Sequence, residues 1–481
     1  MKGENLMLFD RFRITDRKKI IEQIILFPIS VVIGYIYASL KFFNEVDYAG
    51  IAKFPLQAII LMVVFSMGIY TVVTLIIRTK ACAFVKKVFK VFEAEKQFDP
   101  VHICCGVCVF LTLYGLMLKV PCDYRTHTNY AVNIFDWISL KKSLLDLPYP
   151  LWHIFVNLLN KVLYIPGVYA AALTSATFYT AEYCIARKII LEFNKGIPAE
   201  KIKYIDILAA SFMFLQPIYM PWFNENQYLG QGTPNIWHNP TIVCCYPFVL
   251  ICTILFVRMF KKFQNDQKIY VSDYVQMGLF LFLSISAKPA FFQFFIPAVA
   301  ILFIITLIKT KGKSLIFSVK FVISCIPAGL YCIIVYILSF VEEDTSKGNG
   351  VGVEFLKVWK LYSPNIFVSL ILVLAFPIAY IIFQNKHIGN KFQLEFAGLC
   401  VFCALLEYSF LYETGSRMTH GNFSWGVPAA YALLFCFTAA DWVKPLFEKK
   451  KAMMIPLIIY MLHLLFGFRY YIELFQQRIK Y

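Results

Sequence analysis

The sequence predicts an all-α polytopic membrane protein with about 13 transmembrane helices. Of its 481 residues, 59% are hydrophobic and 16% are charged, whereas about a quarter of the residues of a soluble protein carry charge. Apolar runs of about 20 residues, the length that a helix needs to cross roughly 30 Å of hydrocarbon, recur along the chain. Lys and Arg lie in short blocks between these runs, as is typical of cytoplasmic helix ends facing anionic lipid.

The apolar runs define the expected membrane spans. The first follows a long charged segment and lacks a small-residue cleavage site, so we expect it to remain as a signal anchor. The pair at 270–286 and 289–308 is read as a hairpin, because Lys288-Pro289 combines a charge with a helix breaker. The predicted spans are 21–41, 57–77, 101–120, 162–186, 203–222, 240–259, 270–286, 289–308, 314–340, 363–383, 392–410, 425–441 and 453–472.

The distribution of charge supports this topology and places the N-terminus in the cytoplasm. If the basic segment 11–19 is cytoplasmic, every second loop is also rich in Lys or Arg, as the positive-inside rule requires. These inner loops are 78–96, 187–203, 258–268, 309–313, 384–391 and 444–451. The opposite loops hold most of the acids, histidines and tryptophans outside the spans, so the outer face is the expected working face. The main outer loops are 121–161, 223–239, 341–362 and 411–424.

The chain is expected to form a single transmembrane domain over 1–481, without internal repeats. Within it, 1–100 form an N-terminal helical hairpin with a basic cytoplasmic loop, 101–340 form a core, and 341–481 form the C-terminal helices. The absence of a sorting signal in the sequence favours a bacterial plasma membrane over an endoplasmic-reticulum membrane.

Composition also argues against other classes of function. The net charge of +17 comes without any nucleic-acid-binding signature, so no nucleic-acid partner is expected. Most of the fourteen cysteines lie inside apolar runs, where cysteine behaves as a small hydrophobe. We therefore expect no disulfide framework and no cysteine metal site.

The first large outer loop contains the first candidate site residues. Two stretches, 125–140 and 152–163, are expected to form amphipathic helices lying along the membrane surface. Asp123 and His127 are four residues apart and share a helix face with Tyr130. Asp123 is interpreted as a general base or acceptor contact, with His127 orienting it or contacting phosphate. The alternative is that Asp123 is a helix N-cap and His127 an interfacial polar residue.

Aromatic and amide residues of the outer loops are candidate substrate contacts. Trp152 and His153 begin the second interfacial helix, where they bind substrate or anchor the helix to the membrane surface. The loop 223–239 is rich in amides and short of charge, which favours hydrogen bonding to a neutral polyhydroxylated ligand, although it could be a plain connection. Its candidate residues are Asn226, Gln231, Trp237, His238 and Asn239.

Two cations are predicted to bind phosphate. Lys288 lies among apolar residues at a hairpin tip, where its charge must reach the membrane surface or meet an anion. Arg417, with Glu413 four residues before it and His420 and Trp425 after it, suggests an arginine-centred phosphate site, because guanidinium binds phosphate through two hydrogen bonds. The alternative for Glu413 and Arg417 is a helix-surface salt bridge of little energetic value.

From about residue 101 onward the chain resembles the GT-C superfamily of multipass glycosyltransferases. The resemblance rests on a large outer loop with an acid, Asp123, just after a helix end, on two interfacial helices in that loop, and on the run of helices that follows. It implies transfer of a sugar from a polyprenyl-phosphate-linked donor to a glycan or lipid-linked acceptor on the non-cytoplasmic face, and a catalytic or acceptor-contacting role for Asp123.

The resemblance does not supply the contacts to the donor phosphate. We infer them from charge and from the predicted side of the membrane, and they are Lys288, Arg417 and His420. No cofactor is required by this chemistry, and a divalent metal is possible but not indicated. A polysaccharide polymerase of the Wzy type fits the same pattern. From another class, a transporter or flippase for a lipid-linked glycan would place ionisable residues near the bilayer midplane, often in repeated halves. Glu407 is the main residue that favours it. A membrane scaffold without chemistry is the third alternative.

Overall fold

A computed structural model describes residues 100–119, 123–134, 149–340, 350–384 and 392–476. The predicted spans 21–41 and 57–77, their basic loop and the polar segment 341–349 lie outside these residues. So do residues 135–140 of the predicted helix 125–140. Contacts divide the chain into two units; of the described residues, Leu158–Ile165 belong to the first unit and all the others to the second.

In the first unit, the described residues 158–165 hold the end of one helix and a turn, in which Asn160 Nδ2 donates to the Ile165 carbonyl over 2.9 Å. All the interactions described below belong to the second unit.

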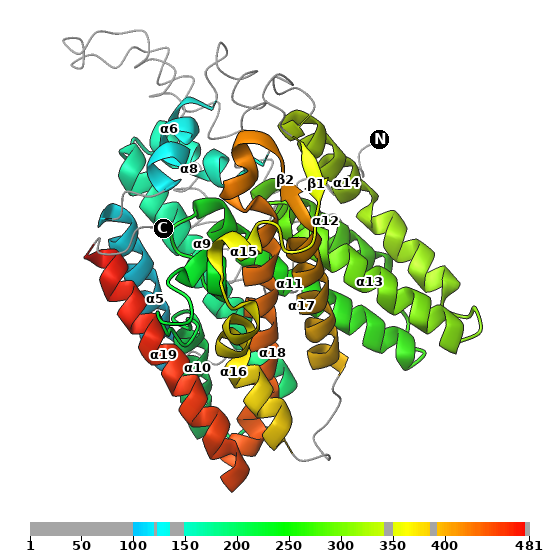
Figure 1. Ribbon diagram of the computed structural model, residues 1–481. Coiled ribbons are helices and arrows are strands. Elements are labelled where there is room, and N and C mark those ends of the chain that lie inside the picture. Colours follow the sequence, from blue (N-terminus) through cyan, green and yellow to red (C-terminus); the bar gives the residue numbers. More distant parts are fainter. Residues whose placement is uncertain (1–99, 120–122, 135–148, 341–349, 385–391, 477–481) are drawn as a thin grey trace, which may run out of the picture. The chain divides into compact units, whose positions relative to one another are not determined.

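The described chain is mainly helical, as predicted, and is a multi-pass membrane protein (Figure 1). Eight of the described helices are long and apolar enough to cross a membrane, and one shorter apolar helix accompanies them. The helices are α5 (Pro100–Lys119), α6 (Asp123–Asn133), α8 (Leu151–Val162), α9 (Gly167–Phe193), α10 (Ala199–Phe212), α11 (Pro240–Gln264), α12 (Val271–Ala287), α13 (Ala290–Lys309), α14 (Leu315–Phe340), α15 (Trp359–Tyr362), α16 (Ile366–Phe383), α17 (Phe392–Phe410), α18 (Gly426–Phe447) and α19 (Met454–Phe475).

Helix α11 is buried along its whole apolar stretch. It packs along α9 and α12, while α18, which is buried almost as completely, packs along α9 and α17. A helix that is apolar all round is stable when other helices enclose it. The loop residues that precede α11 and α18 are therefore attached to the most enclosed helices of the described chain.

The predicted helix 203–222 is wrong in its second half. Helix α10 ends at Phe212, and the chain then runs without regular helix to the short π-helix η3 (Gln227–Gln231) and on to α11. Such backbone is tolerated at membrane depth only where protein encloses it and supplies its hydrogen bonds. Apolar composition alone does not reveal this irregular segment.

Buried polar side chains provide those hydrogen bonds. Gln216 Nε2 donates to the Asn235 carbonyl over 2.7 Å, and Asn235 Nδ2 donates to the carbonyls of Phe212 and Leu215 over 3.0 and 2.9 Å. His463 Nε2 accepts from the Phe376 amide over 3.3 Å, so its Nδ1 is the nitrogen that donates to the Gln216 carbonyl, over 2.7 Å. The side-chain amides of this region therefore serve mainly as hydrogen-bond donors to the irregular backbone.

Two short strands depart from the predicted all-helical fold. Strand β1 (Val351–Val353) pairs antiparallel with β2 (Leu411–Glu413), with Val351 opposite Glu413, and the two lie side by side in Figure 1. A Cβ at Gly352 would lie 2.5 Å from the Tyr412 ring, so a larger residue there would force that ring to move. The pairing fixes Glu413 at the edge of the candidate site.

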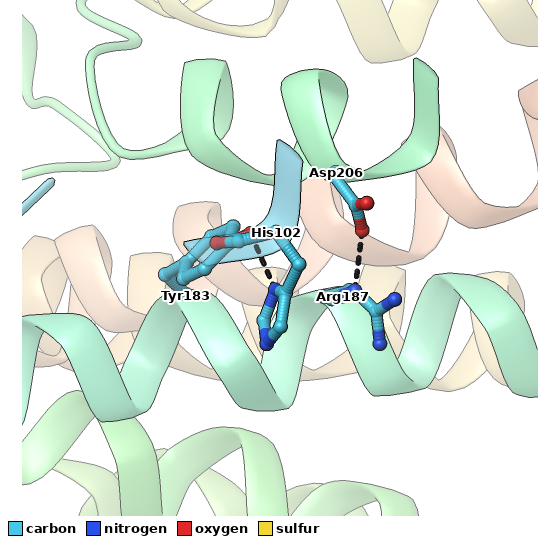
Figure 2. A network of polar contacts seen from close by, with 4 residues as sticks. All are labelled: His102, Tyr183, Arg187 and Asp206. Atoms are coloured by element: carbon cyan, nitrogen blue, oxygen red, sulfur yellow. Dashed lines mark hydrogen bonds and ion pairs between the residues drawn. The ribbon is translucent and has the colours of Figure 1, made fainter. Parts of the chain in front are cut away.

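A polar network joins α5, α9 and α10 (Figure 2). His102 Nδ1 lies 2.7 Å from the Tyr183 hydroxyl, and Arg187 Nε donates to Asp206 Oδ1. Arg187 is 7% exposed and Asp206 is fully buried. A buried charge that loses its partner is strongly destabilising. The predicted topology places these residues at the cytoplasmic ends of their helices.

We expect Asp206→Asn to destabilise the protein by about 3–5 kcal/mol, because it removes the carboxylate that pairs with the buried Arg187 guanidinium. Thermal unfolding in detergent would measure the loss. Glu354→Gln is the matched control, since it removes the exposed Lys357–Glu354 ion pair of 3.0 Å and is expected to cost about 0–1 kcal/mol. Equal melting temperatures for the two variants would contradict the stabilising role of the buried pair.

Candidate functional site

Lys288 is a buried cation in the turn between α12 and α13. Its Nζ lies 4.0 Å from the Trp425 ring centroid and 5.7 Å from that of Tyr149. It donates to Thr241 Oγ1 over 3.2 Å and reaches Asn239 Oδ1 at 3.5 Å. Aromatic ring faces attract a cation most strongly when water is excluded. The charge predicted at this tip is therefore held by neutral groups.

Burial lowers the pKa of Lys288 to about 8, and the negative charge of Asp123 acts in the opposite direction. An anion entering beside the ammonium would favour its charged form. Lys288 thus has the properties of a group that becomes fully cationic when an anion binds.

Arg417 is tied to the aromatic side of Lys288 through a chain of contacts. Its Nη2 lies 3.2 Å from Oε1 of Glu413, which is 3% exposed. Glu413 Oε2 accepts from Asn422 Nδ2, and Asn422 Oδ1 accepts from Trp425 Nε1 over 3.2 Å. The predicted pairing of Glu413 with Arg417 is present, but Glu413 is buried, so the pair is not a simple surface salt bridge.

These residues line one cavity of about 390 Å³. Lys288, Arg417 and Glu413 form its charged side, with Tyr149 and Trp425 beside them. Residues of α14 contribute to another wall: Cys332, Val335 and Tyr336. A cavity with charged and apolar sides suits an amphipathic ligand. Segments more than 250 residues apart in sequence meet here, from Tyr149 to Trp425.

The side chain of Asn239 lies between Asp123 and Lys288 and contacts both. Asp123 is the first residue of α6 and its side chain accepts a hydrogen bond from Asn239 Nδ2 over 2.8 Å, while Asn239 Oδ1 faces Lys288. Asp123 is exposed, so its second oxygen remains accessible to other donors. The structure brings together the predicted base and the predicted phosphate contact without placing them in direct contact.

The hydrogen bond of His127 goes to His153 rather than to Asp123. His127 Nδ1 and His153 Nε2 are 2.9 Å apart. Burial lowers the pKa of His127 well below its usual range and lowers the pKa of His153 to about 3. Both rings are neutral at pH 7, so one proton lies between the two nitrogens. The hydrogen bond that would let His127 orient Asp123 is thus made to His153, and the alternative role of His127 as a phosphate contact stays a prediction.

His238 belongs to the aromatic side of the cluster. Its ring centroid lies 4.7 Å from that of Tyr228 and 6.2 Å from that of Trp425. Burial lowers the pKa of His238 to about 4, with Asp123 opposing that shift. His238 is therefore a neutral side chain near the predicted base.

Three predicted substrate contacts point into the protein. Trp152 Nε1 donates to Ser175 Oγ over 3.0 Å, and Trp237 Nε1 donates to the Tyr179 hydroxyl over 2.8 Å. Gln231 Nε2 donates to the Ile218 carbonyl over 2.7 Å. All three are buried, and their packing gives them structural roles. The structure does not bring them to the cavity.

Three further predicted contacts are exposed and are not among the residues that line the cavity. Tyr130 is 39% exposed on α6, and His420 is exposed at the end of a 3-10 helix, Gly415–His420. Asn226 Nδ2 donates to the Tyr362 carbonyl over 3.1 Å. These three residues can contact a ligand only where it extends beyond the cavity.

Three residues at the site were not predicted. Tyr149 and Gln293 line the cavity, and Thr241 accepts from Lys288. Gln293 had a usable signal, because it is a lone amide in the apolar stretch of α13. Tyr149 and Thr241 gave none, since tyrosine and threonine are common throughout the sequence.

Within the described ranges, no group of three or more His, Cys, Asp or Glu side chains is arranged to hold a metal ion. The expectation that the chemistry needs no metal stays a prediction. Comparison of the chain with protein-family models, curated proteins and solved structures finds no match.

We expect the cavity to bind a short-chain polyprenyl phosphodiester less tightly as the pH rises above about 8, because the buried Lys288 ammonium loses its proton there. Affinity should fall about tenfold per pH unit once the amine titrates. Lys288→Arg should give a flat profile, since guanidinium stays charged. Isothermal calorimetry in detergent between about pH 7 and 10 would measure this.

Lys360→Arg is the matched control for this experiment, because Lys360 is an exposed lysine of α15 that does not line the cavity. It should keep the wild-type pH dependence. A wild-type affinity that does not change with pH would exclude Lys288 as the anion contact.

Proposed function

We propose that this membrane protein is a glycosyltransferase that transfers a sugar from a polyprenyl-phosphate-linked donor to a glycan or lipid-linked acceptor on the non-cytoplasmic face. The observation that carries the proposal is the cavity, which combines two cations with an apolar wall. A lipid-linked sugar phosphate has matching parts, since its phosphate is an anion and its isoprenoid chain is apolar, and it also carries a polar sugar.

The charged side of the cavity suits a phosphate group. Arg417 can present two parallel N–H groups to phosphate oxygens, and Lys288 adds a compact charge from another element. The neighbouring rings of Tyr149 and Trp425 offer flat apolar faces for a sugar or a prenyl unit. The α14 wall would receive the first isoprenoid units.

The proposed reaction is a displacement at the anomeric carbon. Asp123 accepts the proton of the acceptor hydroxyl as its oxygen bonds to that carbon. The bond between the anomeric carbon and the phosphate oxygen breaks through an oxocarbenium-like transition state. The electron pair leaves with the polyprenyl phosphate, whose negative charge is stabilised by Lys288 and Arg417.

The location of the contributing segments supports a site on one face of a membrane. Asp123, Asn239, Lys288 and Arg417 come from four segments that the positive-inside rule assigns to the outer side. They form one connected cluster with Glu413 and Trp425. We propose a bacterial plasma membrane with a cytoplasmic N-terminus as the setting, and synthesis of a cell-surface polysaccharide or glycoconjugate as the process.

A polymerase of the Wzy type would use the same cavity, and both its donor and its acceptor would be lipid-linked glycans. A transporter or flippase is the candidate from another class, and two acids inside helices favour it. Glu182 of α9 is fully buried. In α17, the Oε2 atom of Glu407 is buried beside Gly426. Ionisable residues inside the membrane often mark transport pathways.

Sugar transfer from a radiolabelled polyprenyl-phosphate sugar, in membranes containing the protein, tests the proposal. Asp123→Asn should lower the transfer rate by about 10²–10⁴-fold through loss of the general base. Lys288→Met should lower it by about 10²–10³-fold through loss of charge stabilisation. Lys360→Met, which removes an exposed lysine outside the cavity, should leave the rate unchanged.

Wild-type rates in Asp123→Asn would remove this residue from the mechanism. Movement of the intact labelled lipid between leaflets of proteoliposomes, without cleavage of its sugar–phosphate bond, would instead identify a flippase.

A further inference from the structure

Asn239 uses both ends of its side chain within the protein. Its Nδ2 donates to Asp123 Oδ2 over 2.8 Å. Its Oδ1 accepts from the Ile242 amide over 3.1 Å and from Thr241 Oγ1 over 2.7 Å, and faces Lys288 Nζ at 3.5 Å. The residue is 4% exposed.

The orientation of this amide follows from its partners. A backbone N–H and a lysine ammonium can only donate, so the Asn239 group that faces Ile242 and Lys288 must be the carbonyl oxygen. The NH2 group then faces Asp123, whose carboxylate accepts. One amide thus separates an anion from a cation and satisfies both.

The position of Asn239 is fixed by the helix that it caps. It is the N-cap of α11, and Pro240 at the first helical position restricts the backbone further. Because α11 is enclosed along its length, the amide is held on a rigid element. Asp123 belongs to α6 and Lys288 follows α12, so Asn239 connects three elements.

We propose that Asn239 is a positioning residue that holds the Asp123 carboxylate and the Lys288 ammonium in a fixed relative geometry, and that it does not itself bind substrate. The inference rests on the proposed function for the roles of its two partners. It replaces the sequence-based expectation that Asn239 hydrogen-bonds a neutral polyhydroxylated ligand. In the reaction, it would keep the base aligned with the acceptor while the donor phosphate occupies Lys288.

Asn239→Asp is the informative variant, because aspartate caps a helix as well as asparagine does. The new carboxylate would face Lys288 and would have no N–H for Asp123. Competitive acetylation at a series of pH values, followed by mass spectrometry, measures the pH at which Lys288 is half reactive. This measurement needs no transfer assay. The midpoint of Lys288 reactivity, about pH 8 in the wild type, should rise by about 1–3 pH units beside a carboxylate.

Transfer activity supplies the second measurement. In Asn239→Asp, two facing carboxylates share one proton at low pH and repel each other once that proton is lost. Transfer by this variant should therefore fall as the pH rises, and the loss should appear in kcat rather than in KM. The wild type should not show this loss in kcat. The other titratable groups around the pair are His127, His238, Tyr149, Tyr228, Cys245, Glu413 and Arg417.

Asn365→Asp is the matched control. Asn365 caps α16 by accepting from the Val368 amide over 3.2 Å, as Asn239 caps α11. It should change neither the Lys288 midpoint nor the pH profile. Asp123→Asn provides an independent variant should Asn239→Asp fail to fold, and it should lower the Lys288 midpoint, because it removes the anion that raises the pKa of Lys288.

The outcomes separate this inference from the proposed function. An unchanged Lys288 midpoint in Asn239→Asp, or in Asp123→Asn where the first variant does not fold, overturns the inference. A shifted midpoint with the wild-type pH profile of transfer overturns the positioning role. A shifted midpoint in a protein whose wild type transfers no sugar overturns the proposed function and supports only the geometry. A shifted midpoint together with the altered pH profile supports the inference.

Discussion

The burial of the Lys288 charge is the constraint on which the candidate site depends. An ammonium in an apolar turn loses its hydration, and this cost must be offset by ring faces and oxygen atoms brought to it. Those groups come from separate segments: Trp425 precedes α18, Tyr149 precedes α8, and Asn239 and Thr241 begin α11. Satisfying one cation therefore draws together segments that are distant in sequence, and the same convergence forms the cavity.

The irregular chain between α10 and α11 has a related role. Backbone that leaves the helix inside a membrane protein must find hydrogen bonds, and Gln216, Asn235 and His463 provide them. This support fixes the path into Asn239, where α11 starts. The amides that suggested a sugar-binding loop are thus mostly needed by the fold, and the residue with the clearest link to the site is the one at the end of the segment.

Apolar runs predicted most of the described helices, because lipid imposes a minimum helix length that sequence reveals directly. The run at 203–222 failed, since hydropathy does not distinguish a helix from enclosed irregular chain; Pro217 and Pro221 were the available signal. Lys288 could be selected as a candidate because charge in apolar surroundings is costly, and Arg417 because guanidinium binds phosphate through two hydrogen bonds. Trp152 and Trp237 could not be assigned correctly, since the direction of an indole depends on tertiary packing, which one sequence does not show.

The charges around the cavity suggest how binding and release could be balanced in the proposed reaction. His127, His153 and His238 are neutral at pH 7, because burial lowers the pKa of each. The connected cluster then contains two cations, Lys288 and Arg417, and two carboxylates, Asp123 and Glu413. An entering phosphate must compete with Glu413 for Arg417, which weakens its binding. A donor held too firmly would leave a polyprenyl phosphate that dissociates slowly, so a partly neutralised arginine favours turnover over affinity.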